Sequence, residues 1–400
     1  MPELTFYSKL AMASRRWPLT HRPLRATRHF FAKKFPDALA DWIRLLAPTS
    51  SLRFGPPKSS FSIYQSLLYE NRRPARVLVT DQGAPKASEN SMLVISNCLQ
   101  HACQPWPVFW SRHKNARLVS PSLALLDERK RVCRESVYSD FAMQDDPAWR
   151  YFYLPKPVSL TGNWTSLVSR WCPNTGVPTF THWILDALPR LAMLAEFPAD
   201  TKIIVPCKLA GYQKETLKLL GLLDRIRYAP EKHLLVENYF FASPTAMIDC
   251  YNPFGVNFLR EKFLPLMDKN YSGPKKFLIH RSNKSRGIVN EAEVYEFFRA
   301  RGWEIVDTEK LTFAQEIKLF NDAEAVGGVF GSGFTNAIWC KPGCKLLPFV
   351  ADSWIDGYVE WIAQVVRAEF YFRIFQSDHA MRAKINLETV REMLRAARLE

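Results

Sequence analysis

Short apolar runs alternate with amphipathic segments throughout the C-terminal half of the chain, and this alternation constrains the fold more than any other feature. The runs predict strands at 275–280, 303–307 and 344–350, and the segments between them predict helices at 290–302 and 311–323. Such an alternation is typical of a parallel sheet covered by helices.

The N-terminal half alternates less regularly, starting near residue 75. Apolar runs predict strands at 75–80, 91–96 and 202–206, and segments 182–194 and 212–221 have helical spacing. Single cores rarely grow beyond about 300 residues, so a chain of 400 residues is expected to form two domains. We therefore predict an α/β fold with two doubly wound, Rossmann-like domains that face each other across a cleft.

The domain boundaries are placed where the composition changes. We predict a basic arm and linker at 1–60, an N-terminal domain at 61–265, a C-terminal domain at 266–375, and a closing helix at 376–400 that packs back across the domains. Residues 251–274 are the predicted connection between the two domains.

The charge of the chain predicts an anionic partner. Lys and Arg number 54 against 39 Asp and Glu, which gives a net charge of +15. Nucleic acid, a membrane surface and a phosphorylated substrate all fit, but no nucleic-acid module is recognisable, so we expect no specific nucleic-acid binding. In the arm, "SRRWPLTHRPLRATRHFFAKKFP" interleaves basic and aromatic residues, which suits an anionic lipid surface, although a solvated chain terminus has the same composition.

Cysteine usage and hydropathy indicate the compartment. The 8 cysteines include no CxxC pair, which favours buried thiols over a disulfide framework or a common zinc module. Cys98, His101 and Cys103 come nearest to a metal cluster, and their spacing alone is weak evidence for zinc. The N-terminus lacks the apolar core of a signal peptide and no stretch reaches about 18 apolar residues, so we expect a cytoplasmic protein, peripheral on the inner membrane if the arm binds lipid.

The segment "FTHWILDALPRL" contains the first candidate for chemistry. His182, Asp186 and Arg190 are four residues apart in succession, so a continuous helix would place them on one face. A carboxylate one turn from an imidazole orients it and raises its basicity, as a general base requires. A capping, solvated helix face has the same spacing, and Pro189 weakens the helical geometry.

The segment "HRSNKSRGIVNE" follows the predicted strand at 275–280 and contains the second candidate. Ligands of open parallel sheets bind at the carboxyl ends of strands, where Arg281 and Arg286 could hold a diphosphate. A solvated basic loop is the alternative.

Four glycines in "VGGVFGSGFTNAIW" form the third candidate. With Ser332, Thr335 and Asn336 at a helix start, the backbone N–H groups of this segment could bind an anion. The pattern matches neither GxGxxG nor a P-loop, and glycines also permit close packing of a helix on a strand.

In this order, the segments resemble glycosyltransferase family 61. "HWILDALPRL" is similar to the family's His-Trp-x-x-Asp-x-Leu-Pro-Arg signature, and the stretch from "HRSNKSRGIVNE" to "CKPG" resembles its long C-terminal block. The resemblance covers about residues 130–375. The family includes bacterial capsular-polysaccharide glycosyltransferases and eukaryotic xylan and O-linked N-acetylglucosamine transferases.

The resemblance implies a GT-B architecture and an inverting, metal-independent sugar transfer without a cofactor. The donor would be a nucleotide-sugar such as a UDP-sugar, and the acceptor a glycan or lipid-linked glycan of bacterial capsule or surface polysaccharide synthesis. It assigns catalysis to His182 and Asp186 and acceptor binding to Trp183 and Arg190. The implied donor-binding residues are Arg281, Arg286, Asn290, Glu291, Gly331, Ser332, Gly333, Thr335 and Asn336.

The sequence also departs from the family pattern. Phe330 stands where the family usually has His, Pro348 where it has an acidic residue, and Thr179 where it has Asn, and the usual Glu-Gln order is reversed in Gln315 and Glu316. These departures motivate an alternative function, that of a catalytically silent GT-B-like binding or scaffold protein in a polysaccharide assembly complex.

Overall fold

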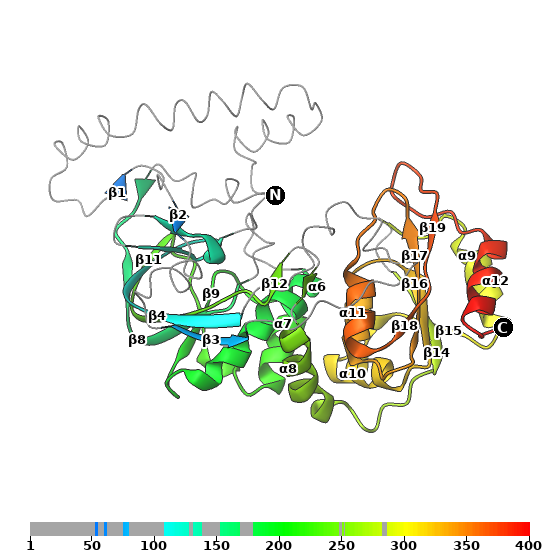
Figure 1. Cartoon of the computed structure of the whole chain (residues 1–400), viewed down its shortest axis with the longest axis horizontal. Coiled ribbons are helices and arrows are strands. Elements are labelled where there is room, and N and C mark those ends of the chain that lie inside the picture. The colour runs from blue at the N-terminus through cyan, green and yellow to red at the C-terminus, as the bar shows by residue number, and fades with distance from the viewer. Residues whose placement is uncertain are drawn as a thin grey trace, which may run out of the picture.

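The computed structural model describes the chain from residue 108 onward, apart from residues 128–130, 138–152, 169–178, 248–249, 252 and 282–285, together with three short strands before residue 108. The basic residues of the predicted arm up to residue 50, the segment 91–96 and the cluster of Cys98, His101 and Cys103 lie outside the described residues. The described part is a mixed α/β structure with two large sheets and helices packed between and beside them (Figure 1).

The C-terminal sheet has six strands, and every pair in it is parallel. Its order is β15-β14-β16-β17-β18, with β19 pairing β17 further along the same edge. Numbered by their order in the chain, the first five strands lie 2-1-3-4-5, which is a doubly wound order. The strands are β14 (Lys276–Ile279), β15 (Glu304–Val306), β16 (Ala325–Val329), β17 (Lys345–Ala351), β18 (Glu369–Phe370) and β19 (Arg373–Phe375). The alternation in the sequence therefore predicted this sheet correctly.

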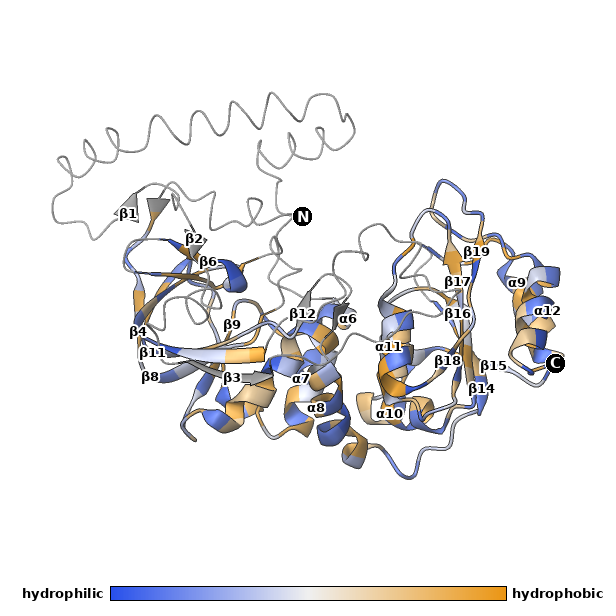
Figure 2. Ribbon diagram, in the orientation of Figure 1, coloured by the Kyte–Doolittle hydropathy of each residue, from blue (hydrophilic) through white to orange (hydrophobic). Residues whose placement is uncertain are grey.

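Helices cover both faces of the C-terminal sheet (Figure 1). One face carries α9 (Glu291–Arg299) and α12 (Leu387–Ala396), and the other carries α10 (Phe313–Asp322), the 3-10 helix η10 (Ser332–Trp339) and α11 (Tyr358–Val366). Figure 2 shows apolar residues along the strands between these two layers. Gly302 follows α9 with a left-handed φ of 75°, as a glycine after a helix end does.

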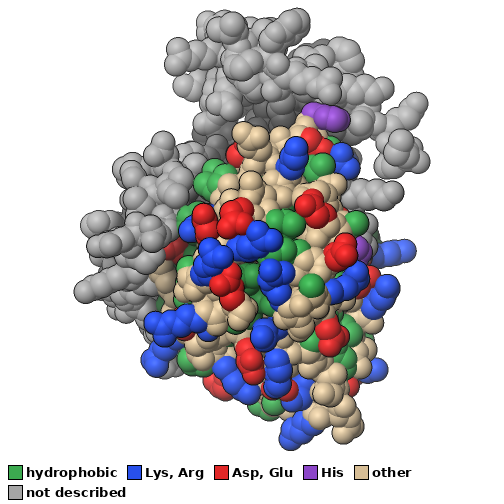
Figure 3. Space-filling view, turned by 90° about the vertical axis from the view of Figure 1, so that its right-hand side faces the viewer, with side chains coloured by type: hydrophobic (Ala, Val, Ile, Leu, Met, Phe, Trp, Pro, Cys, Tyr) green, Lys and Arg blue, Asp and Glu red, His purple; other side chains and the backbone are tan. Residues whose placement is uncertain are grey.

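The closing helix α12 packs on its own sheet. Leu387, Val390 and Leu394 contact the core that α9 and the outer face of the C-terminal sheet form. The helix therefore extends the C-terminal unit. The sequence had suggested that it packs back across the two domains, and the structure does not show this. Its outer surface, seen in Figure 3, intersperses Lys and Arg with Asp and Glu, so the excess positive charge is not gathered on this face.

The N-terminal sheet has nine strands and is mixed. Strands β10, β9, β8 and β11 are parallel neighbours, whereas β4 pairs antiparallel with β11, β3 and β5, and β5 with β6. The prediction of a wholly Rossmann-like domain is wrong here, because the long strand β4 pairs antiparallel with all three of these neighbours. The strands are β2 (Ser60–Phe61), β3 (Ala75–Val79), β4 (Val108–Val119), β5 (Ala124–Leu126), β6 (Val132–Cys133), β8 (Val158–Ser166), β9 (Lys202–Val205), β10 (Ile226–Tyr228) and β11 (His233–Ala242).

Smaller elements complete the described chain. Two short strand pairs stand apart from the large sheets, β1 with β7 and β12 with β13. These strands are β1 (Arg53–Phe54), β7 (Tyr153–Leu154), β12 (Ala246–Met247) and β13 (Cys250–Tyr251). The short 3-10 helices are η2 (Arg134–Ser136), η7 (Leu223–Arg225), η8 (Leu264–Leu266) and η9 (Thr308–Lys310).

The helix that contains the first candidate motif changes its winding twice. It begins as α6 (Phe180–His182), continues as the π-helical turn η5 (Trp183–Ala187) and ends as the 3-10 helix η6 (Leu188–Glu196). Pro189 explains the change, because it has no N–H to donate and its ring would clash with a carbonyl four residues earlier in a regular α-helix.

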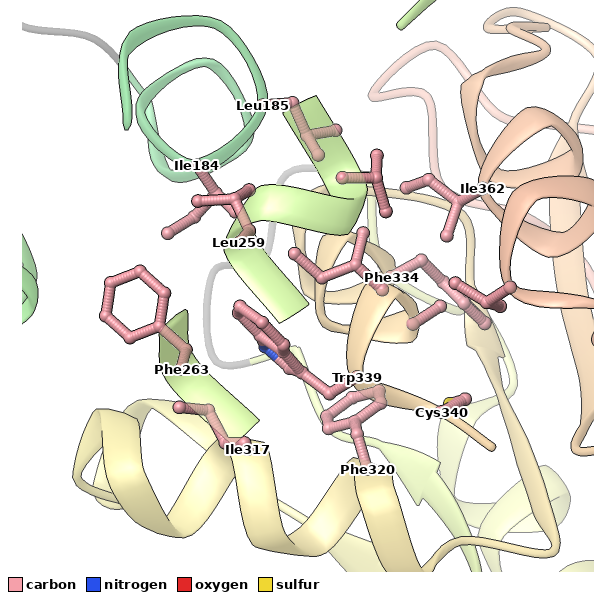
Figure 4. Packing of buried hydrophobic residues seen from close by; sticks show 14 of the residues in the cluster. Ile184, Leu185, Leu259, Phe263, Ile317, Phe320, Phe334, Trp339, Cys340 and Ile362 are labelled. Atoms are coloured by element: carbon pink, nitrogen blue, oxygen red, sulfur yellow. The ribbon is translucent and has the colours of Figure 1, made fainter. Parts of the chain in front are cut away.

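Helices from both halves of the molecule share one hydrophobic core, which we call the shared core. The N-terminal half contributes η5, η6, α7 (Gly211–Leu219) and α8 (Pro253–Phe263), the last of which lies in the predicted connection. Figure 4 shows labelled residues of the two halves side by side, among them Leu185, Leu259, Phe263, Ile317, Phe334 and Trp339. The Trp339 ring centroid lies 5.8 Å from that of Phe263 and 5.8 Å from that of Phe313.

Polar contacts reinforce the shared core. The Arg260 guanidinium of α8 donates to the carbonyl oxygens of Ile338 and Cys340 at the end of η10. The Glu215 carboxylate of α7 accepts from the backbone N–H of Phe313, at the start of α10, at 2.8 Å. Within the part of the chain that the structure describes, no helix is long and apolar enough to span a bilayer.

Candidate active site

The strand order of the C-terminal sheet identifies the edge at which a ligand is expected. Neighbouring strands β14 and β16 send their connections to opposite faces, to α9 and to η10. Ligands of doubly wound sheets bind outside the carboxyl ends of such a strand pair. His280 and Arg281 follow β14, and Phe330, Gly331 and Ser332 follow β16. The fold thus brings the second and third candidate segments together at one edge, which we call the carboxyl edge.

Arg281 lies directly against Gly331. A Cβ atom added to Gly331 would collide with Nη1 of Arg281 and lie 3.5 Å from its Cζ. The backbone of Gly331 is extended, with φ 166°, so a larger residue here would have to displace the end of the Arg281 side chain. Tyr358 holds this turn from α11, because its hydroxyl donates to the Gly331 carbonyl oxygen at 2.6 Å.

Arg286 adds a second positive charge beside Arg281. Burial lowers the pKa of Arg281, and the charge of Arg286 lowers it further, against smaller opposing effects of Tyr358 and Glu309. The guanidinium carbon of Arg286 lies 5.0 Å from the ring centroid of Trp354. Two guanidinium groups whose charges repel each other favour an anion between them, and a phosphate can accept two hydrogen bonds from one guanidinium group.

The other glycines of "VGGVFGSGFTNAIW" serve packing between the strands and η10. A Cβ on Gly327 would lie 2.6 Å from Leu278 Cδ2, and one on Gly328, whose φ is 140°, would lie 3.1 Å from the Ile279 carbonyl oxygen. Gly333 would place a Cβ 3.0 Å from Ile279 Cγ2. The packing interpretation therefore holds for Gly327, Gly328 and Gly333, and anion binding at Gly331 stays a prediction.

Thr335 and Asn336 are buried and engaged by other side chains. The Thr335 hydroxyl lies 2.8 Å from that of Thr181. The amide nitrogen of Asn336 donates to the Glu316 carboxylate at 2.8 Å, and its carbonyl oxygen accepts from the Trp339 indole at 3.0 Å. Ser332, in contrast, is exposed at the carboxyl edge. Donor binding by Thr335 and Asn336 stays a prediction, while the contacts seen fix η10 in place.

Asn290 and Glu291 also have protein partners. The Asn290 side-chain amide donates to the Ile385 carbonyl oxygen at 2.9 Å and accepts from the Ile385 backbone N–H at 3.0 Å. These two hydrogen bonds join the start of α9 to the segment before α12. The Glu291 carboxylate accepts from the Tyr295 hydroxyl at 2.8 Å, and the Tyr295 oxygen lies 2.8 Å from Nδ1 of His280. Because Tyr295 donates to Glu291, its oxygen accepts from the Nδ1–H of His280, which orients that ring beside Arg281.

The His182 and Asp186 side chains form the pair that their spacing predicted. Nδ1 of His182 lies 2.9 Å from Oδ2 of Asp186, and the two side chains are 26% and 6% exposed. The contact between Thr181 and Thr335 places the start of this helix against η10. The pair is thus an oriented imidazole on a carboxylate that is almost fully buried.

Trp183 and Arg190 make their observed contacts in the protein interior. Trp183 is 1% exposed, and its indole donates to the Thr216 hydroxyl at 2.9 Å. Arg190 is buried too, donates to the Val168 carbonyl oxygen at 3.2 Å and lies over the ring of Phe241. Acceptor binding by these two residues stays a prediction.

Sequence reasoning missed three aromatic residues of the carboxyl edge: Tyr295, Trp354 and Tyr358. The position of Tyr295, one helical turn after Glu291, is a signal that could have found it. Trp354 and Tyr358 follow β17, and the carboxyl-end rule selects them only when β17 is known to neighbour β16. Among the described side chains, no group of three or more His, Cys, Asp or Glu is arranged to hold a metal ion.

The family model described as Glycosyltransferase 61 matches residues 180–347. These residues belong to glycosyltransferase family 61. The match runs from the helix of His182 into β17, so it contains the His182–Asp186 pair, Arg281, Arg286 and Gly331. Family membership indicates a glycosyltransferase. A comparison with curated proteins found no match.

Two departures from the pattern of family 61 lie in the packed interior. Phe330 is buried in the shared core, with its ring 5.3 Å from that of Tyr358. Pro348 lies inside β17 opposite Gly328. Its neighbours Leu347 and Phe349 face the layer of α9 and α12, so the Pro348 ring faces the layer of α10, η10 and α11. Phe330 thus packs in the shared core, and Pro348 points to the same face of the sheet.

Proposed function

We propose that the protein transfers a sugar from a nucleotide-sugar donor, such as a UDP-sugar, to a hydroxyl of a glycan acceptor. The observation that carries this proposal is the placement of Arg281 against Gly331 at the carboxyl edge, with the positive charge of Arg286 near enough to act on Arg281. A departing nucleoside diphosphate develops negative charge, and preorganised guanidinium groups stabilise such charge in the transition state. The two arginines supply the charge that a divalent cation supplies in metal-dependent transfer, which supports a metal-independent reaction.

His182 is the proposed general base and Asp186 the group that orients it. If Nδ1–H donates to Asp186, Nε2 is left to accept a proton from the acceptor hydroxyl. The hydroxyl oxygen then bonds to the anomeric carbon as the bond from that carbon to the diphosphate breaks, and the diphosphate leaves with the electron pair. A single displacement of this kind inverts the anomeric configuration.

The resemblance to the family supports the biological setting of the proposal. We place the reaction in bacterial capsule or surface polysaccharide synthesis, on a glycan or lipid-linked glycan acceptor. In this proposal the halves act as the two units of a GT-B enzyme in the cytoplasm, and the basic arm at 1–60 contacts the inner membrane.

The decisive experiment compares Arg281→Ala with the wild type in sugar transfer or nucleotide-sugar hydrolysis. We expect kcat/KM to fall by about 10²- to 10³-fold, because a charge contact to the leaving group is lost, with an unchanged melting temperature. Arg395→Ala is the matched control, since Arg395 is an exposed arginine of α12 that pairs with Glu400. Retained turnover in Arg281→Ala would contradict the assignment.

The same assay tests the alternative of a silent scaffold. A scaffold should neither hydrolyse UDP-, GDP- or CMP-sugars nor be stabilised by them against heat, since a ligand stabilises only a protein that binds it. Stabilisation by one of these donors would count against the scaffold.

A further inference from the structure

Trp354 is an exposed indole at the carboxyl edge, and the family signature does not include it. It is 47% exposed, more than any other large hydrophobic side chain that the structure describes. Its backbone position is set by a turn, because the Trp354 N–H donates to the carbonyl oxygen of Ala351, the last residue of β17, at 2.9 Å. Since β17 neighbours β16, this turn lies next to the one that carries Gly331.

Trp354 ends a continuous series of contacts along the edge. Gly331 lies against Arg281, Arg281 is close enough to Arg286 for their charges to interact, and Arg286 lies over the Trp354 ring at 5.0 Å. The series thus places a neutral aromatic surface directly beyond two adjacent cations. A diphosphate with an aromatic group attached to one end matches this order of charge and apolar surface.

The series also has a direction. At the Gly331 end, Thr335 of η10 contacts Thr181, the residue before the proposed base His182. At the other end, Arg286 precedes the bridge from Ile288 to Ala383, and these two residues pack in the core that α9 and α12 form on their side of the sheet. The sugar must point toward the base, so the nucleoside must point toward Trp354.

We propose that Trp354 is the stacking platform for the nucleobase of the donor, an inference that rests on the proposed function. Its indole face is large and rigid, and stacking on an aromatic ring tolerates any base. Arg286 is then shared, since it contacts the indole and the diphosphate and fixes their relative position.

Binding measurements on the full chain separate stacking from mere positioning of Arg286. UDP, GDP and inorganic pyrophosphate are titrated against the wild type, Trp354→Ala and Trp354→Phe. We expect Trp354→Ala to weaken the nucleoside diphosphates by about 5- to 100-fold and to leave pyrophosphate unchanged, with Trp354→Phe close to the wild type. Tyr228→Ala, which removes an exposed aromatic on β10, is the control.

A spectroscopic signal tests the same contact. A stacked base should quench the fluorescence of Trp354, so UDP should quench the wild type more than Trp354→Phe, and pyrophosphate should quench neither.

The outcomes distinguish the two proposals. Equal losses for UDP and pyrophosphate would show that Trp354 only positions Arg286, and unchanged UDP affinity in Trp354→Ala would overturn the stacking as well. Failure of the wild type to bind any of the three ligands would overturn the proposed function itself.

Discussion

The carboxyl edge and the shared core contain residues of the same short segments, but the residues at the edge are partly open and those in the core are buried. Within residues 331–339, Gly331 and Ser332 lie at the edge beside Arg281, whereas Thr335 and the residues after it are buried between the halves. The difference teaches that a family motif contains few residues that face a ligand. Most of the segment positions those few.

The segment 180–190 divides in the same way. His182 and Asp186 form a partly open pair, while Trp183 and Arg190 are enclosed. Asp186 lies in the π-helical turn and Arg190 in the 3-10 helix, so the two residues are not related by the regular α-helical spacing that the sequence suggested.

The largest effect within the shared segments is expected for Asp186→Asn. An amide cannot hold His182 in the basic tautomer as a carboxylate does, so we expect kcat to fall by about 100-fold or more with little change in KM. Asp200→Asn, at an exposed carboxylate that bonds Asn163, is the control. Unchanged kcat in a folded Asp186→Asn protein would show that the His182–Asp186 pair packs the helix and takes no part in catalysis.

Glu316 gives the shared core a pH-dependent stability. Burial raises the pKa of Glu316 from 4.5 to about 8, Glu215 adds to the rise, and the hydrogen bond from Asn336 opposes it. Between these pH values the folded chain keeps a proton that the unfolded chain releases, so this group makes the free energy of unfolding fall as pH rises from 4.5 to 8.

Substitution of Glu316 by Gln tests this pH dependence. We expect Glu316→Gln to remove a change on the order of 3 kcal/mol across that interval, visible as a melting temperature that varies less with pH than that of the wild type. Identical pH profiles of the two proteins would mean that Glu316 ionises normally in the core.

The smallest effect is expected at the hydroxyl pair that joins the two regions. Thr181→Val or Thr335→Val alone leaves the other hydroxyl buried without its partner, at a cost of about 1 to 3 kcal/mol in urea unfolding. The double variant should cost less than the sum of the single ones, because both hydroxyls are then gone. Strictly additive losses would show that the two threonines do not interact.

The sequence allowed the C-terminal sheet to be predicted because its strands are short apolar runs between helices whose ends are marked in the sequence. It also allowed the His182–Asp186 pair to be predicted, since residues four apart are neighbours on the surface of an α-helix. The strand β4 was missed, because its middle residues His113, Lys114 and Asn115 interrupt the apolar pattern and its pairing partners are distant in sequence. Trp354 became visible only through the strand order, which no local pattern encodes.

The shared core has a consequence for how such a chain can be altered by recombination. Phe263 and Arg260 of one half fit Trp339 and the end of η10 in the other. A C-terminal half taken from a relative to change the donor would therefore expose mismatched apolar surfaces unless α8 and its partners were exchanged with it. An exchange between relatives would therefore have to include α8 as well as the C-terminal sheet and its helices.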